Sequence, residues 1–267
     1  MKSVWGSVLV YVAAVALGIF IVGPLVVVVL AGFLPEVSLR SFPPNWFQHG
    51  LTLDHYIYIF TGVTPQSYIT HGQLRSMTSQ EVRTVMQAAL NSAIIATSVM
   101  IINWILGSLA AFAFAKLRFP GRTPTFFFIT LSRLIPAVGL AVPYYAIVQS
   151  LGLLDTLGSL ILIHSVLTLP FSILILSLYF RNVPLEIEES AQIDGCGPFQ
   201  TMLRITLPLA LPSLVGVGLF AFMLSYSEFL FGLLITTSMN SRTVSVLMGA
   251  LSTNTDVSWA LLNATIT

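Results

Sequence analysis

Long stretches without Asp, Glu, Lys or Arg constrain this sequence more than any other feature. The first runs from Ser3 to Pro35, and comparable stretches recur along the chain. A transmembrane helix needs about 20 consecutive, mostly apolar residues. Only 8% of the 267 residues are charged and 56% are hydrophobic, whereas about 25% charged residues is usual in soluble domains. The pattern predicts an all-α polytopic membrane protein, with residues 1–267 forming a single transmembrane domain.

The uncharged stretches predict five complete spans. They cover approximately Ser7–Phe33, Thr84–Ala115, Thr123–Gln149, Leu157–Phe180 and Leu209–Thr236. We expect the third to be interrupted by Arg133 and bent at Pro136 and Pro143, because proline removes a backbone donor. A sixth span begins near Asp256-Val257-Ser258-Trp259, but only eight residues follow Trp259. Eight helical residues rise about 12 Å, far less than the roughly 30 Å hydrocarbon core, so we expect a truncated sixth span.

The short loops predict the orientation of the chain. Lys116, Arg118 and Arg122 lie between spans two and three, whereas the loop between spans three and four contains Asp155 and no Lys or Arg. Basic short loops face the cytoplasm. We therefore expect a cytoplasmic N-terminus, an extracytoplasmic segment at about residues 36–83, and a cytoplasmic loop at about residues 182–208.

Between spans four and five lies a short polar island, Glu189–Pro212. Pro184 suits the first turn of a helix, and three glutamates follow it near the positive end of that helix, where carboxylates are favoured. Asp194-Gly195 ends or bends the helix, since glycine accepts backbone angles that other residues resist. These residues predict a helix–bend–helix that presents small and acidic groups for docking.

The polar island resembles the EAA loop of ABC-importer permeases. The resemblance is carried by Glu189-Ser190-Ala191, Asp194-Gly195 and Ile205-Thr206-Leu207-Pro208, with Ser190 and Cys196 each standing where that family usually has Ala. It implies a coupling helix that docks in a cleft of a cytoplasmic ATPase; the alternative is an amphipathic surface loop without a partner. The residues assigned to coupling are Glu189, Ser190, Ala191, Asp194, Gly195, Cys196, Ile205, Leu207 and Pro208.

Other stretches resemble the carbohydrate branch of this family and its MalG-like (type I ABC importer) subunits. They are Asn91-Ser92, Phe119-Pro120-Gly121, Ser132–Pro136, Leu151–Thr156 and Ser225–Phe231, with an apparent insertion at about residues 61–80. The resemblance implies a multi-pass protein of the cytoplasmic (inner) membrane of a bacterium or archaeon that imports a carbohydrate or related polyol. The implied partners are a second, MalF-like permease, two cytoplasmic ATPase subunits and an extracytoplasmic solute-binding protein.

No segment of the chain fits a nucleotide-hydrolysing site. A phosphate-binding loop reads G-x-x-x-x-G-K-[ST], and neither Lys2 nor Lys116 stands in such a context. We therefore expect this subunit to be no enzyme and to bind no cofactor, with ATP and Mg held by the partner ATPases. No basic run indicates nucleic acid.

Polar residues within the spans are the candidates for a translocation pathway. Ionisable groups inside a span are costly and usually face a cavity or a partner. Glu228 either faces the pathway or forms a structural hydrogen bond. Arg133 either extends to the cytoplasmic interface, pairs with an acid, or lines the pathway. The pathway candidates are Glu228, Tyr226, Ser225, Asn91 and Arg133.

The histidines indicate no catalytic or metal site. His49, His55, His71 and His164 lack metal-ligand spacing, and His164 in span four is expected to hydrogen-bond a neighbouring helix. An ion- or proton-coupled secondary transporter without an ATPase is the alternative function. It would require several interior acids or a paired charge network within the membrane, with discontinuous helices at a repeat interface, whereas Glu228 and Arg133 are the acid and the base that lie well inside the spans.

Overall fold

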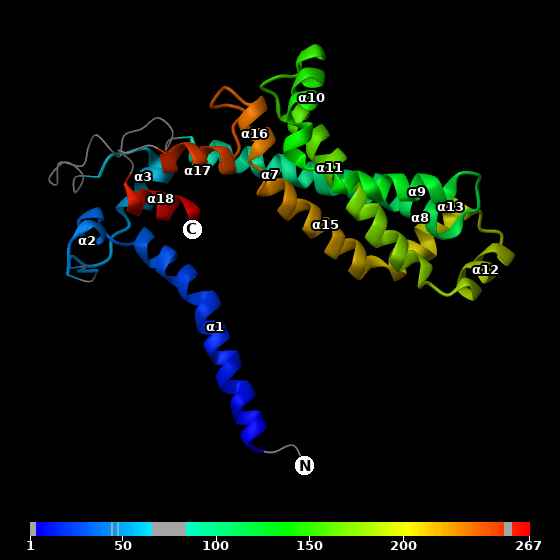
Figure 1. The fold of residues 1–267 in the computed structure, drawn as a ribbon, viewed down its shortest axis with the longest axis horizontal. Helices are drawn as coiled ribbons and strands as arrows, with labels where there is room; N and C mark the ends of the chain where they lie inside the picture. The colour runs from blue at the N-terminus through cyan, green and yellow to red at the C-terminus, as the bar shows by residue number, and fades with distance from the viewer. Residues whose placement is uncertain (1–3, 44, 47, 66–83, 254–257) are drawn as a thin grey trace. The chain divides into compact units, whose positions relative to one another are not determined.

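The computed structural model describes residues 4–43, 45–46, 48–65, 84–253 and 258–267, which form helices and no strand. His71, Asp256 and Val257 lie outside this part of the chain, as does most of the apparent insertion. Two compact units are present, one formed by Met1–Met86 with Leu247–Thr267 and the other by Gln87–Val246. Figure 1 labels the helices of both units.

The first unit joins the beginning and the end of the chain. Its helices are α1 (Val4–Gly32), α2 (Glu36–Arg40), α3 (Asp54–Thr61) and α18 (Trp259–Ile266). Helix α18 lies against α1, where a Cβ on Gly32 would come within 3.0 Å of the Ala264 backbone. The buried carboxylate of Glu36 accepts hydrogen bonds from Ser258 Oγ and the Ala260 N–H at 2.5 and 2.9 Å. These bonds hold the N-terminus of α18, which coincides with the predicted start of a sixth span.

A long helix and a parallel neighbour form the centre of the second unit. Helices α7 (Val85–Ile102) and α8 (Ser108–Lys116) are joined by a π-helical turn, η1 (Asn103–Gly107). Helix α11 (Leu157–Arg181) runs beside them in the same direction (Figure 1). Because both run the same way, the chain between them must return to its starting side. This return agrees with the alternating directions predicted for the second to fourth spans.

Two apolar clusters in the second unit are separated by a buried polar contact. Ile95 and Val99 pack with Leu160 and Ile163 in one cluster, and Ala111 and Phe112 pack with Leu176 and Phe180 in the other. Between them, Asn103 Nδ2 donates to Thr168 Oγ1 at 2.8 Å, and Ser172 Oγ donates to Asn103 Oδ1 at 2.7 Å. Satisfied polar groups of this kind fix how two apolar helices align.

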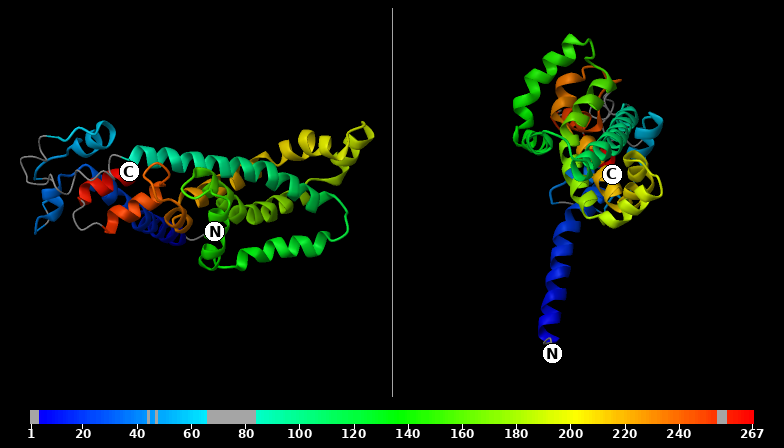
Figure 2. Two further views of the ribbon diagram at one scale, coloured as in Figure 1. Left: turned by 90° about the horizontal axis from the view of Figure 1, so that it is seen from above. Right: turned by 90° about the vertical axis from the view of Figure 1, so that its right-hand side faces the viewer.

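The predicted third span is a sharply broken helix pair. Helices α9 (Arg122–Leu131) and η2 (Ser132–Leu134) precede α10 (Ala137–Ser150), and the helix axis bends by 102° between the two halves. Figure 2 shows the break. Ile135 is extended, as expected of a residue before proline, so the break falls at Pro136 as predicted. Pro143 lies inside α10 and does not end it.

The predicted fifth span was placed too far along the chain. After α12 (Leu185–Ile193) come α13 (Pro198–Thr201), η3 (Met202–Thr206), α14 (Leu207–Leu209) and α15 (Leu211–Tyr226). The helix stops at Tyr226 instead of continuing to Thr236, and a separate short helix, α16 (Leu230–Ile235), follows. The reason is local: the Glu228 side chain accepts hydrogen bonds from the first N–H groups of α16, which favours a new helix start.

Helix length and composition confirm the membrane-protein fold. Three helical stretches of the described residues, Gly6–Gly32, Val85–Lys116 and Leu157–Arg181, can each cross a bilayer. They match the first, second and fourth predicted spans. Counting each bent pair, α9–α10 and α13–α15, as one span brings the number to five.

Asp155 joins two loops at the end of the second unit opposite α12. Its Oδ1 accepts hydrogen bonds from the Thr237 and Ser238 N–H groups at 2.8 and 3.0 Å and from Ser241 Oγ. Burial raises the pKa of Asp155, but these hydrogen bonds outweigh burial and hold the pKa well below the ordinary value. The loop before α11 is thereby fastened to the segment before α17 (Val244–Thr253).

Candidate functional site

The predicted coupling helix is α12, and its end follows from the Asp194-Gly195 pair. Gly195 has a φ of +88°, a conformation that side chains with a Cβ disfavour. Its N–H donates to the Gln192 carbonyl at 3.0 Å, and the Cys196 N–H donates to the Ala191 carbonyl at 2.9 Å. This is a Schellman motif, which pairs the last carbonyls of a helix. The predicted helix–bend–helix is therefore confirmed as structure.

Beneath α12 lies a buried polar contact that we call the α12 joint, formed by Lys116, Val183, Glu188 and Thr206. Glu188 is 3% exposed, and its carboxylate lies 3.1 Å from Lys116 Nζ and accepts a hydrogen bond from Thr206 Oγ1 at 2.9 Å. Lys116 Nζ also donates to the Val183 carbonyl at 2.9 Å. The joint thus ties the end of α8 to α12, to the chain just before α12 and to the end of η3.

Most residues assigned to coupling lie on the opposite, solvent-facing side. Glu189, Ser190, Asp194, Gly195 and Pro208 are exposed, Ala191 is buried, and Cys196, Ile205 and Leu207 are half-buried. Ser190, Ala191, Asp194 and Ile205 line a shallow groove of about 390 Å³.

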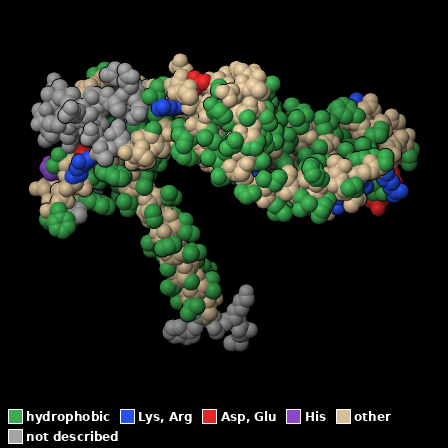
Figure 3. Space-filling view, turned by 45° about the horizontal axis from the view of Figure 1, so that its top comes forward, with side chains coloured by type: hydrophobic (Ala, Val, Ile, Leu, Met, Phe, Trp, Pro, Cys, Tyr) green, Lys and Arg blue, Asp and Glu red, His purple; other side chains and the backbone are tan. Residues whose placement is uncertain are grey.

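Apolar side chains beside this groove are also unusually exposed. Ile193 is 87% and Phe199 60% exposed, and the space-filling view shows charged side chains gathered at the α12 end of the second unit (Figure 3). An exposed apolar patch with a polar rim is typical of a protein-docking surface.

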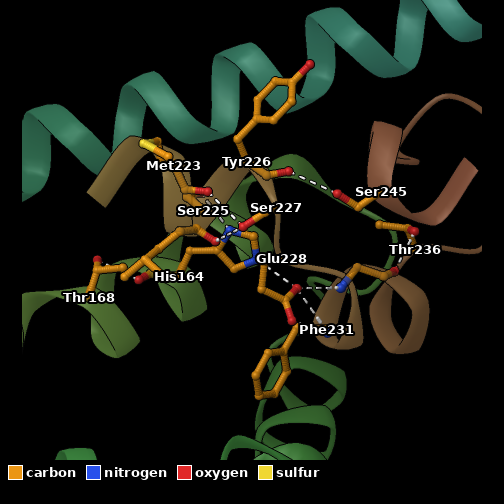
Figure 4. A network of polar contacts seen from close by, with 12 residues as sticks. His164, Thr168, Met223, Ser225, Tyr226, Ser227, Glu228, Phe231, Thr236 and Ser245 are labelled. Atoms are coloured by element: carbon orange, nitrogen blue, oxygen red, sulfur yellow. Dashed lines mark hydrogen bonds and ion pairs between the residues drawn. The ribbon is translucent and has the colours of Figure 1, made fainter. Parts of the chain in front are cut away.

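Three of the predicted pathway residues, Ser225, Tyr226 and Glu228, lie near one another together with His164 (Figure 4). The Glu228 carboxylate accepts hydrogen bonds from the N–H groups of Phe231 and Gly232 at 3.1 and 3.2 Å. His164 is 2% exposed; its Nδ1 lies 2.8 Å from Ser225 Oγ, which confirms the predicted bond between helices. Its Nε2 lies 3.3 Å from Glu228 Oε2, an ion-pair distance without hydrogen-bond alignment.

A cavity of about 500 Å³ brings three pathway candidates together. Arg133, Ser225 and Glu228 line it, together with His164 and Thr168. Arg133 donates to the Leu167 carbonyl at 2.9 Å, and its guanidinium lies 5.7 Å from the centre of the Phe171 ring. Glu228 thus makes a structural hydrogen bond, whereas the contacts of Arg133 described here are with a carbonyl and an aromatic ring. Both residues face the cavity, and their part in a translocation pathway stays a prediction.

Asn91 and Tyr226 do not line that cavity. Asn91 is buried, and its Nδ2 donates to the carbonyls of Asn240 and Arg242 at 2.7 and 3.0 Å. The Tyr226 ring stacks on Phe222, with ring centroids 5.8 Å apart. Their part in a pathway stays a prediction, while the Asn91 hydrogen bonds hold the segment between α16 and α17.

The sequence did not predict the buried ion pair of the α12 joint. It indicated Lys116 only as a basic loop residue and Glu188 only as one of three glutamates near a helix start. The available signal was the spacing of Glu188 and Ala191, which places them on one face of a helix. Within the described ranges, no group of three or more His, Cys, Asp or Glu side chains could hold a metal ion.

Comparison with known proteins decides the family. A family model described as "Binding-protein-dependent transport system inner membrane component" matches residues 103–267, more than half of the chain. The chain belongs to this family. The permease is 30% identical to the inner membrane ABC transporter permease protein YcjP of Escherichia coli over 242 residues, which cover 90% of this chain and 80% of YcjP.

Two further similarities agree with this assignment. DasC, a permease protein of a diacetylchitobiose uptake system in Streptomyces coelicolor, is 27% identical over 258 residues, covering 97% of this permease and 86% of DasC. A crystal structure of a bacterial ABC transporter that imports alginate has a TM-score of 0.73 at 19% identity, covering 100% of this chain and 92% of the matched chain. The permease therefore has the fold of an ABC-importer membrane subunit, and the predicted family and fold are confirmed.

Proposed function

We propose that this permease forms half of the translocation pathway of an ATP-driven importer for a carbohydrate or a related polyol. The relatives named above include a diacetylchitobiose permease, and the cavity at Glu228 offers hydroxyl, imidazole and carboxylate groups, which suit a solute rich in hydroxyls. The observation that carries the proposal is α12, a helix with an exposed apolar and acidic face that is held from beneath by a buried ion pair.

The proposed assembly contains a second, MalF-like permease, two ATPase subunits and an external solute-binding protein. ATP and Mg would be bound by the ATPases. Residues 182–208 and the N-terminus would face the cytoplasm, and residues 36–83 would face the binding protein. The basic residues around α12 support this orientation.

Two experiments test the assembly. The full chain, tagged and purified in mild detergent from its own host, is expected to bring an ATPase subunit with it. Cys196 is the single cysteine of the sequence, so in intact cells a membrane-impermeant maleimide is expected to leave it unlabelled until the membrane is opened. Labelling from outside would contradict the orientation, and purification without an ATPase would contradict the function.

A proton- or ion-coupled transporter is the competing function, and the His164–Glu228 pair is the feature it would use. Reconstituted vesicles separate the two. The proposal expects uptake that requires ATP and the binding protein and persists when ion gradients are collapsed. Uptake driven by a gradient without ATP would favour the alternative.

A further inference from the structure

Glu188 in the α12 joint differs from the neighbouring charged side chains because it is buried and both of its carboxylate oxygens are paired. Glu188 is 3% exposed, whereas its neighbours Glu186 and Glu189 face solvent. Both carboxylate oxygens of Glu188 are engaged, Oε1 by Thr206 and Oε2 by Lys116. Docking on the exposed side of α12 does not require this carboxylate, so its burial needs another explanation.

We infer that Lys116 is a positioning residue that makes α8 follow the movements of α12. This inference rests on the proposed function, because it assigns the path by which displacement of α12 reaches the spans. Lys116 is the last residue of α8, and its ammonium contacts α12 through Glu188 and the chain before α12 through Val183. A rotation of α12 must therefore either carry the end of α8 with it or leave buried charges unpaired.

Leaving the buried charges unpaired is the more costly of these two outcomes. Removing one member of a buried ion pair leaves an uncompensated charge and strongly destabilises the structure. Thr206 extends the same contact to the end of η3, which is followed by α14 and, beyond a bend of 82°, by α15. Helix α8 and η3 therefore both end at one buried joint with α12, and a single displacement of α12 acts on both of them.

The inference is tested with Lys116→Met, the double variant Lys116→Met/Glu188→Gln and the control Arg118→Met. The double variant leaves no unpaired charge, so it is expected to fold even if Lys116→Met does not. Arg118 is an exposed basic residue of the same loop, and its replacement removes the same charge without touching the joint.

Two measurements are made on the full-length chain in lipid vesicles. The first is the mobility of a nitroxide attached to Cys196, just beyond α12. The second is the ratio of solute-stimulated to unstimulated ATP hydrolysis in the assembled complex. In the double variant we expect an unfolding temperature and an assembly close to those of the unsubstituted protein, together with a more mobile label. The ratio of stimulated to unstimulated hydrolysis should fall by about tenfold, which is within the range usual for coupling between sites. Arg118→Met is expected to leave both measurements unchanged.

A double variant with the unsubstituted mobility and ratio would overturn the inference while leaving the proposed function intact. Equal losses in Arg118→Met would also overturn it, because the effect would then come from loop charge. Absence of stimulated hydrolysis in the unsubstituted complex would overturn both the proposed function and the inference.

Discussion

Replacement of Gly195 tests whether the end of α12 must keep its left-handed turn. No atom lies within 4 Å of a Cβ built at Gly195, so alanine or valine would meet no steric obstacle within the chain. The cost is conformational: a φ of +88° disfavours a residue with a Cβ by about 1–2 kcal/mol, and more for β-branched valine. A loss of that size changes the population of the native turn about 5- to 30-fold.

We expect solute-stimulated ATP hydrolysis to fall in the order Gly, Asn, Ala, Val at position 195, while the complex still assembles. Gly195→Asn is the matched control, because asparagine tolerates left-handed angles yet carries a Cβ. The assay is stimulated hydrolysis by the reconstituted complex at equal permease content. Full stimulation in Gly195→Val would refute the reasoning. If Gly195→Asn were as impaired as Gly195→Ala, close approach of a partner rather than the backbone angle would be the cause.

Three other substitutions test the remaining contacts. Asp155→Ala should lower the unfolding temperature through loss of about 1–2 kcal/mol of hydrogen bonding. Because the pKa of Asp155 is depressed in the folded protein, the stabilisation by its carboxylate is present above the ordinary pKa near 3.9 and should disappear as pH falls below that value. The melting curves of the two proteins should therefore converge in acid. Gly218→Ala should destabilise the chain by about 1–3 kcal/mol, because the new Cβ overlaps the Trp104 indole Nε1. Adding Trp104→Phe should restore part of the lost unfolding temperature, and no recovery in the double variant would contradict the overlap. Glu228→Ala should cost about 1 kcal/mol by uncapping α16, whereas Glu228→Gln should melt nearly normally, and uptake should fall in both if the carboxylate serves the pathway.

The sequence predicted those elements whose signal is local. An uncharged apolar run of the right length identifies α1, α7–α8 and α11, and the Asp194-Gly195 pair identifies where α12 ends. The break at Pro136 was also visible, because proline restricts the residue before it. The size of the bend could not be predicted from the sequence, since a bend of 102° depends on what the two halves of the span pack against.

Two features were not predicted. The early end of α15 is set locally, where the Glu228 carboxylate accepts hydrogen bonds from the first N–H groups of α16, but the uncharged stretches on both sides of Glu228 conceal that change. The inward direction of Glu188 depends on Lys116, which lies on another helix. No pattern within α12 indicates that one of three glutamates pairs with a residue so far away.

The π-helical turn η1 has a consequence for that pairing. A wide turn takes up one residue more than an α-helical turn, so everything after it is offset by one position, which is about 100° around the axis. Lys116 lies beyond η1 in the same helix. Deleting a single residue from η1 would swing its ammonium roughly a quarter of the way round, away from Glu188. The rotational setting of the Lys116 end of this span is thus decided near its middle.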